Sequence, residues 1–242
     1  MKNAVLGNES FTGRNRVLIL VYLIGQFLAF VSFTTYSQAE KSTVTWIMTD
    51  LLEAKEGVSV VGNPKIIDSP FGKAVHFDGK EDGIFLEEMP LMNLSEFSVE
   101  MLIQFDTGSN HEQRYFHTGS VMEDRVLLEM RSDKNTWYLD GMVETRGNWV
   151  VLMSPEFTHR LGQWYHIAFT VKEGKQITYV NGNKELEGKI DFSPISKGAT
   201  SIGVRQNRVS WFKGAIYSIH ITNRALNLDE FIISEQQYFI TD

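Results

Sequence analysis

The sequence predicts an all-β protein that folds as an antiparallel sandwich or barrel. Short segments in which apolar and polar residues alternate recur along the chain, as in half-buried strands. Dipeptides that end in glycine separate several of these segments, and no stretch before Asn227 has a convincing helical period. Helix is therefore expected in less than about a tenth of residues 40–242, far below the usual share.

The clearest alternation covers Phe97–Phe105, where the apolar residues share one face. The other face carries Ser98, Glu100 and Gln104 and is expected to be solvated. Comparable segments, each predicted to be a strand, are Arg125–Arg131, Trp164–Val171, Gln176–Val180 and Ala215–Ile221.

Turns are predicted where glycine follows a short polar residue, because glycine accepts a positive φ. The four dipeptides of this kind are Asp78-Gly79, Asp82-Gly83, Asp140-Gly141 and Asn181-Gly182. Near the C-terminus, Asn227 is expected to cap a short helix, with Glu230 three residues later as its reciprocal partner.

Residues 1–39 have the pattern of a signal peptide. Three basic residues precede the apolar run Val17–Phe33, and small residues at Ser37 and Ala39 predict cleavage after Ala39. The alternative is a retained membrane anchor, for which the run is short and is interrupted by Gln26 and Ser32. We expect cleavage, which leaves no stable membrane span and makes residues 40–242 one domain.

The charge and the cysteine content narrow the function classes. The formal net charge is −7 and there is no basic patch, so nucleic acid is an unexpected partner. The chain has no cysteine, which excludes zinc–thiolate sites and cysteine nucleophiles. A chain with a leader and no disulfide fits a secreted or periplasmic protein of bacterial type.

Three stretches, in the expected order, resemble the laminin-G-like members of the concanavalin A-like superfamily. They are Pro70–Gly79, Trp164–Phe169 together with Tyr179–Gly182, and Phe212–Ile216 together with Asn223–Leu226. The resemblance implies a two-sheet antiparallel jelly-roll sandwich with a short C-terminal helix. It also implies a sugar-binding module, an adhesion module or a domain attached to a glycoside hydrolase, since fold alone does not fix function.

No cofactor is expected, and calcium is doubtful. The closing motif of the resembling family often carries an acid where this chain has Tyr217. Asp78 and Asp82 remain as possible oxygen ligands, but a hard cation needs several such ligands.

The leading interpretation is an exported module that binds a poly- or oligosaccharide without catalysis. Its expected ligand-binding residues, chosen as aromatic platforms and planar donors, are Trp137, Trp149, Arg131, Arg205, Asn207, Arg208 and Trp211. The loop from Arg205 to Trp211 and the turn near Trp149 are expected to form one rim of the site. The alternative for these aromatic residues is packing at the edge of the core.

Two other functions stay open. A glycan-cleaving enzyme would use Glu100, Glu129 and His166 on one sheet face, although the Glu-x-Asp-x-x-Glu motif of laminarinase-type enzymes is absent. An envelope adhesion or protein-interaction module would instead present a large flat apolar patch.

The leader generates a testable prediction. Protein isolated from a native-like host should begin at Glu40, because signal peptidase reads the small residues that precede it. Intact-mass spectrometry measures this directly. A full-length species that needs detergent for its extraction would contradict the prediction and support the anchor.

Overall fold

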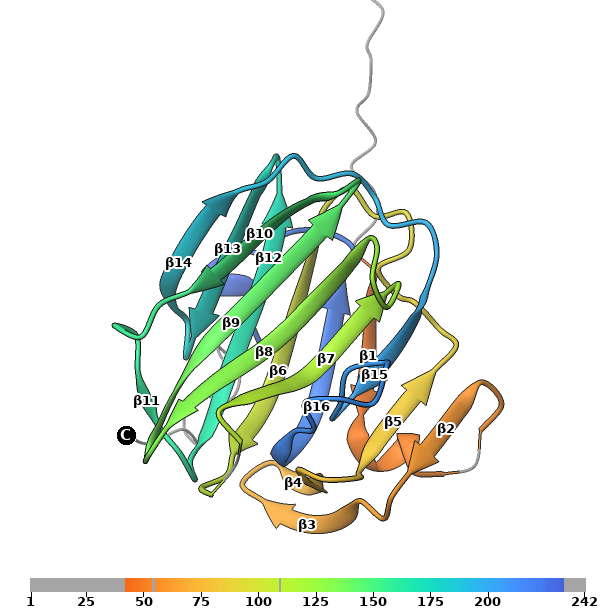
Figure 1. Cartoon of the computed structure of the whole chain (residues 1–242), viewed down its shortest axis with the longest axis vertical. Helices are drawn as coiled ribbons and strands as arrows, with labels where there is room; N and C mark the ends of the chain where they lie inside the picture. The colour runs from red at the N-terminus through yellow and green to blue at the C-terminus, as the bar shows by residue number, and fades with distance from the viewer. Residues whose placement is uncertain (1–41, 54, 109, 233–242) are drawn as a thin grey trace, which may run out of the picture. The chain divides into compact units, whose positions relative to one another are not determined.

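The computed structural model describes residues 42–53, 55–108 and 110–232, where two eight-stranded antiparallel sheets pack face to face (Figure 1). The predicted leader lies outside the described residues. The predicted two-sheet sandwich is confirmed. Among the described residues the only helices are two short 3₁₀ helices, η2 (Met48–Leu51) and η3 (Leu228–Glu230). No helix in this part of the chain is long and apolar enough to cross a membrane.

Each sheet mixes strands that are distant in sequence. Sheet A has the order β14 (Asn183–Lys189), β13 (Lys175–Val180), β12 (Trp164–Lys172), β6 (Phe97–Phe105), β16 (Lys213–Thr222), β4 (Gly72–Asp78) and β3 (Lys65–Ser69), and β1 (Thr43–Ile47) also pairs with β16. Sheet B has the order β10 (Asn148–Met153), β9 (Thr136–Thr145), β8 (Arg125–Asp133), β7 (Glu112–Gly119), β15 (Ala199–Ile202), β5 (Gly83–Leu86) and β2 (Val58–Val61), and β11 (His159–Arg160) also pairs with β9.

The core lies between the sheets and is rich in aromatic side chains. Phe105 on β6 packs against Tyr115, Trp137 and Phe212, with ring centroids 5.5, 4.2 and 5.7 Å away. All four rings are at most 2% exposed. Because β6, which carries Phe105, and β7, which carries Tyr115, are the middle strands of their sheets, this cluster joins the centres of both sheets.

The five segments predicted from alternation correspond to β6, β8, β12, β13 and β16. Asn181-Gly182 joins β13 to β14 as predicted, and both residues have positive φ, 48° and 76°. The turn predicted at Asp140-Gly141 is wrong, because both residues lie inside β9. A Cβ at Gly141 would lie 2.9 Å from the Phe169 ring, so this glycine permits the close approach of the two sheets.

The outer face of sheet A is covered where the chain returns over it after β16. Ser98 and Glu100 of β6 are buried there, so the expected solvated face is wrong. The Ser98 hydroxyl donates to the carbonyl of Arg224 (2.9 Å) and accepts from the backbone N–H of Leu226 (2.8 Å). The predicted capping pair closes this segment, since the Glu230 carboxylate accepts from the Asn227 backbone N–H at 3.0 Å.

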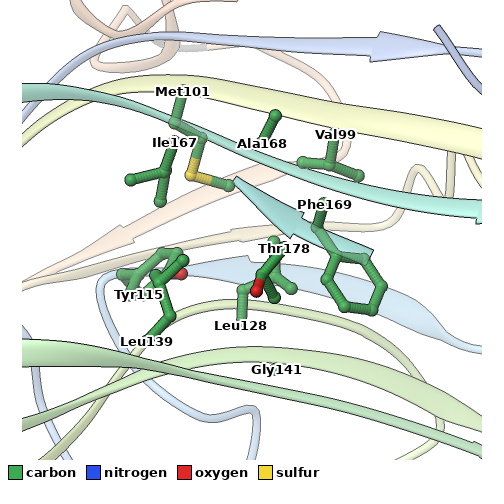
Figure 2. A pocket seen from close by; sticks show the side chains of 10 residues that line it. All are labelled: Val99, Met101, Tyr115, Leu128, Leu139, Gly141, Ile167, Ala168, Phe169 and Thr178. Carbon is green, nitrogen blue, oxygen red and sulfur yellow. The ribbon is translucent and has the colours of Figure 1, made fainter. Parts of the chain in front are cut away.

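Figure 2 shows a small cavity between the sheets, lined by side chains of both. Its volume is about 10 Å³, and most of its lining is apolar, including Met101, Leu128 and Phe169. A space of this size holds at most about one water molecule. A sugar-sized ligand therefore does not fit in this cavity.

The close approach at Gly141 predicts the effect of adding one methyl group. Gly141→Ala should lower the free energy of unfolding by about 1–3 kcal/mol, because the new Cβ meets the Phe169 ring in a packed core. Denaturant unfolding measures the change. Combined with Phe169→Leu, the loss should be smaller than the sum of the two single losses, whereas strict additivity would contradict the proposed contact.

Candidate ligand-binding groove

The outer face of sheet B carries a groove of about 400 Å³, which we call the outer groove. Its lining comes from β7, β8, β9, β10 and the loop after β15, and consists of Arg114, Arg125, Leu127, Glu129, Arg131, Asp140, Met142, Trp149, Val151, Met153 and Arg205. These four neighbouring strands lie in front in Figure 1. The groove is large enough for a small ligand.

The strand register sorts this lining into three rows that run across the strands. The middle row is apolar, because Leu127 pairs with Met142 and Met142 pairs with Val151. One flanking row consists of Arg125, Glu144 and Trp149. The other consists of Arg114, Glu129, Asp140 and Met153. Directly paired residues point to the same face of a sheet, so all three rows face outward.

The second flanking row is held by a network of ion pairs. Arg131 Nε donates to Asp140 Oδ2 at 2.7 Å, and its Nη1 bonds the Glu112 carboxylate. Arg114 also pairs with Glu112, and its Nε lies 2.5 Å from Glu129 Oε1 without the angle of a hydrogen bond. Two arginines thus share three carboxylates over the edge of the groove.

Glu129 is a buried carboxyl group of this network, with only 3% of its surface exposed. Burial raises its pKa to about 7. Arg114 and Arg131 act to lower the pKa, while Asp140 and Glu112 act to raise it. Glu129 therefore gains and loses its proton near neutral pH.

Arg125, Arg205 and Trp149 line the groove away from this network. Arg125 Nη2 lies 2.6 Å from Glu144 Oε2. Arg205 comes from the loop between β15 and β16, and its Nη2 donates to the Val121 carbonyl at 3.0 Å. Trp149 on β10 is 64% exposed, which leaves most of its ring available to a ligand.

The structure distributes the predicted ligand-binding residues over several places. Arg131, Trp149 and Arg205 line the outer groove. Trp149 and Arg205 approach it from different sides, with β8 and β9 between them, and do not form one rim. Trp137 is 0% exposed and its indole N–H donates to the Arg160 carbonyl at 3.2 Å, so the expectation that it stacks on a ligand is wrong.

The rest of the predicted loop points elsewhere. Arg208 lies over the Phe85 ring, 5.4 Å from its centroid, and Asn207 is exposed beside it. Trp211 is half-buried and packs next to Gly83 at the start of β5. None of these three residues lines the outer groove.

The catalytic set that the enzyme alternative requires is not assembled. His166 and Glu100 face outward from sheet A, with His166 Nε2 3.0 Å from Glu100 Oε1, whereas Glu129 faces outward from sheet B. Both sheet A residues are at most 2% exposed because the C-terminal segment covers them, and the Ile232 backbone N–H bonds Glu100. These three residues cannot act on one substrate.

The carboxylates of Asp78 and Asp82, the predicted oxygen ligands, accept hydrogen bonds from backbone N–H groups. Asp78 Oδ1 accepts from three backbone N–H groups, those of Lys80, Glu81 and Asp82. The two oxygens of Asp82 accept from Asn63 and Asp78. Burial acts to raise the pKa of Asp78, but these backbone donors outweigh it and lower the pKa. The oxygens stabilise turns, and no group of three metal-ligating residues occurs in the described part of the chain.

Sequence reasoning missed most of the groove. The apolar middle row consists of Leu127, Met142 and Val151, which look like core residues in sequence. Only the pairing of β8 with β9 and of β9 with β10 brings them to one outward row. The available signal was the alternation in Arg125–Arg131, where Leu127 shares a face with Glu129 and the arginines.

The raised pKa of Glu129 predicts a pH dependence of stability. In the unfolded chain Glu129 ionises near the ordinary glutamate pKa of about 4.5. Its contribution to the stability of the folded state is therefore complete below about pH 4.5 and is lost as the pH rises through about 7. Glu129→Gln removes this loss. Relative to wild type, the variant should therefore be more stable at pH 8 than at pH 5. Denaturant unfolding at both pH values measures the difference in free energy of unfolding.

Glu187→Gln provides the control, because Glu187 is exposed and hydrogen bonds from Lys184 and Lys175 lower its pKa. The stability of Glu187→Gln relative to wild type should not increase as the pH rises. Parallel pH curves for wild type and Glu129→Gln would show that Glu129 ionises normally.

Comparison with solved structures shows sandwiches of the same fold. The fourth domain of an extracellular arabinanase from Geobacillus stearothermophilus, solved with arabinotriose, has a TM-score of 0.56 and 21% identity, over 72% of this chain and 85% of that domain. The binding domain of botulinum neurotoxin serotype D has a TM-score of 0.55 and 16% identity over 75% of this chain. The binding domain of botulinum neurotoxin DC, solved in complex with SialylT, has a TM-score of 0.56 and 11% identity over 74% of this chain. The chain spans 46% of each toxin structure.

A search of curated protein sequences finds no match to this chain. A family model does match residues 78–231, which run from the end of β4 to the end of the C-terminal covering segment. That model describes the concanavalin A-like lectin/glucanases superfamily. Since the match covers most of the chain and the two-sheet sandwich agrees with it, this protein belongs to the concanavalin A-like lectin/glucanase superfamily.

Proposed function

We propose that this protein binds an oligosaccharide or a segment of a polysaccharide in the outer groove, without catalysis. The observation that carries the proposal is the exposed ring of Trp149 beside an apolar row that is flanked by charged rows. Sugar rings have apolar C–H faces and polar edges. An aromatic platform beside fixed guanidinium and carboxylate groups matches both.

The comparisons support a sugar ligand, since two of the similar structures were solved with arabinotriose or SialylT. The export signal expected in residues 1–39 fits a module that meets glycans outside the cytoplasm, in the periplasm or the medium. We therefore propose a secreted or periplasmic protein.

Cleavage of the glycan is the second candidate, and one arrangement favours it. Glu129, with its raised pKa, pairs directly across the strands with Asp140, so two carboxyl groups lie side by side as in a glycosidase. Both residues are only 3% exposed, and Arg131 bonds Asp140 while Arg114 contacts Glu129. A substrate would have to displace both arginines, so the geometry favours binding. Release of shorter products from any bound glycan, abolished by Glu129→Gln, would reverse this conclusion.

The test of binding uses Trp149. On a glycan array the purified protein should bind a subset of glycans, and Trp149→Ala should weaken that binding about three- to tenfold, because the stacking surface is lost. The melting temperature should stay within about a degree, since the side chain is mostly exposed. Isothermal titration with the best glycan gives the affinities.

Two variants make the result specific. Trp149→Phe keeps an aromatic face and should retain most of the affinity. Phe157→Ala removes an exposed aromatic ring that does not line the groove and should bind like wild type. If no glycan binds wild type, or if Trp149→Ala binds every glycan equally well, the outer groove is not a carbohydrate site.

A further inference from the structure

The arginines of the outer groove are not equally neutralised. Arg114 and Arg131 share Glu112, Glu129 and Asp140, and Arg125 pairs with Glu144. Arg205 differs, because no carboxylate among the described residues lies within ion-pair distance of it. Its Nη2 contacts the Val121 carbonyl, at 3.0 Å, and the Met122 sulfur, at 3.5 Å.

Arg205 is also partly removed from water. Its Nε is buried and has no hydrogen-bond partner. Burial lowers the pKa of Arg205, and the neighbouring positive charges of Arg114 and Arg125 lower it further. A guanidinium in such a place is stabilised when an anion joins it, because the anion supplies both the missing charge and the missing acceptors.

We infer that the ligand of the outer groove is an acidic oligosaccharide whose carboxylate or sulfate group binds at Arg205. The inference rests on the proposed function and deepens it. A guanidinium offers two parallel donors to a carboxylate or sulfate, whereas a neutral hydroxyl satisfies only one of them. The half-buried residues of the apolar row, Met142 and Val151, line the same groove as Arg205 and would receive a face of the sugar ring.

The groove is not simply a basic surface. Glu112, Glu129, Asp140 and Glu144 neutralise the other three arginines, so a long polyanion meets about as many negative as positive charges there. One acidic group placed at one arginine fits this distribution better than a uniformly charged chain does. Specificity therefore requires a ring on the apolar row together with an anion at Arg205.

The experiment compares ligands that differ only in charge. Tetrasaccharides that carry a single uronate residue (galacturonate, glucuronate or mannuronate), their methyl esters, and a tetrasaccharide with a single sulfate group are titrated calorimetrically into the full protein. At least one acid should bind about ten- to a hundredfold more tightly than its ester, the range for a charged hydrogen bond. The preference should shrink as salt is added. A stronger response to the sulfated sugar than to any uronate would assign the anion as sulfate.

Variants locate the anion. Arg205→Gln keeps a donor for the Val121 carbonyl but removes the charge, so it should abolish the preference for the acid while binding of the ester persists. Arg160→Gln removes the charge of an exposed arginine on β11 that does not line the groove, and it should leave the preference unchanged. Melting temperatures confirm that both variants are folded.

The outcomes separate the two proposals. If ester and acid bind equally and Trp149→Ala weakens both, the groove binds sugar and the assignment of an anion to Arg205 is overturned. The assignment is also overturned if the preference for the acid survives Arg205→Gln. If no neutral or acidic sugar binds, the proposed function fails, and the inference fails with it.

Discussion

The register between β8 and β9 is the constraint on which the outer face of sheet B depends. It places Arg125 opposite Glu144, Leu127 opposite Met142, and Glu129 opposite Asp140. Side chains alternate strictly between the faces of a strand, so a slip of one residue would send these charged groups into the core. The same slip would bring Val126, Leu128 and Met130, all at most 3% exposed, to the surface. One register thus fixes both the core and the groove.

The two sheets use their outer faces differently, and the chain after β16 explains why. It crosses sheet A, bonds Ser98 and Glu100, and packs Leu226 and Phe231 against Ala168 and Tyr179. Ser98 and Glu100 on this face find hydrogen-bond partners within the fold, and His166 Nε2 contacts Glu100, whereas His166 Nδ1 has no hydrogen-bond partner among the described residues. On sheet B, Trp149 is 64% exposed and Met142 and Val151 are half-buried, so this part of the outer face stays accessible.

The fold was largely predictable from the sequence, whereas the groove was not. A period of two in the sequence predicts strands such as Phe97–Phe105, and Asn181-Gly182 has the residues that a tight hairpin requires. The turn predicted at Asp140-Gly141 failed because glycine there serves packing against Phe169, a contact between residues far apart in sequence. Arg131, Trp149 and Arg205 were found by residue type. Arg114 and the middle row needed the strand pairing, and the burial of Trp137 needed the whole sandwich.

The position of β16 has a consequence for how the molecule acquires its structure. This strand is the last one among the described residues, yet it lies between β6 and β4 in sheet A and also pairs with β1 (Figure 1). Sheet A therefore cannot close until Lys213–Thr222 has been synthesised, and the earlier strands wait with unpaired edges. Pairings of such long sequence separation form slowly. The interval before β16 completes sheet A is therefore when the chain is most exposed to aggregation.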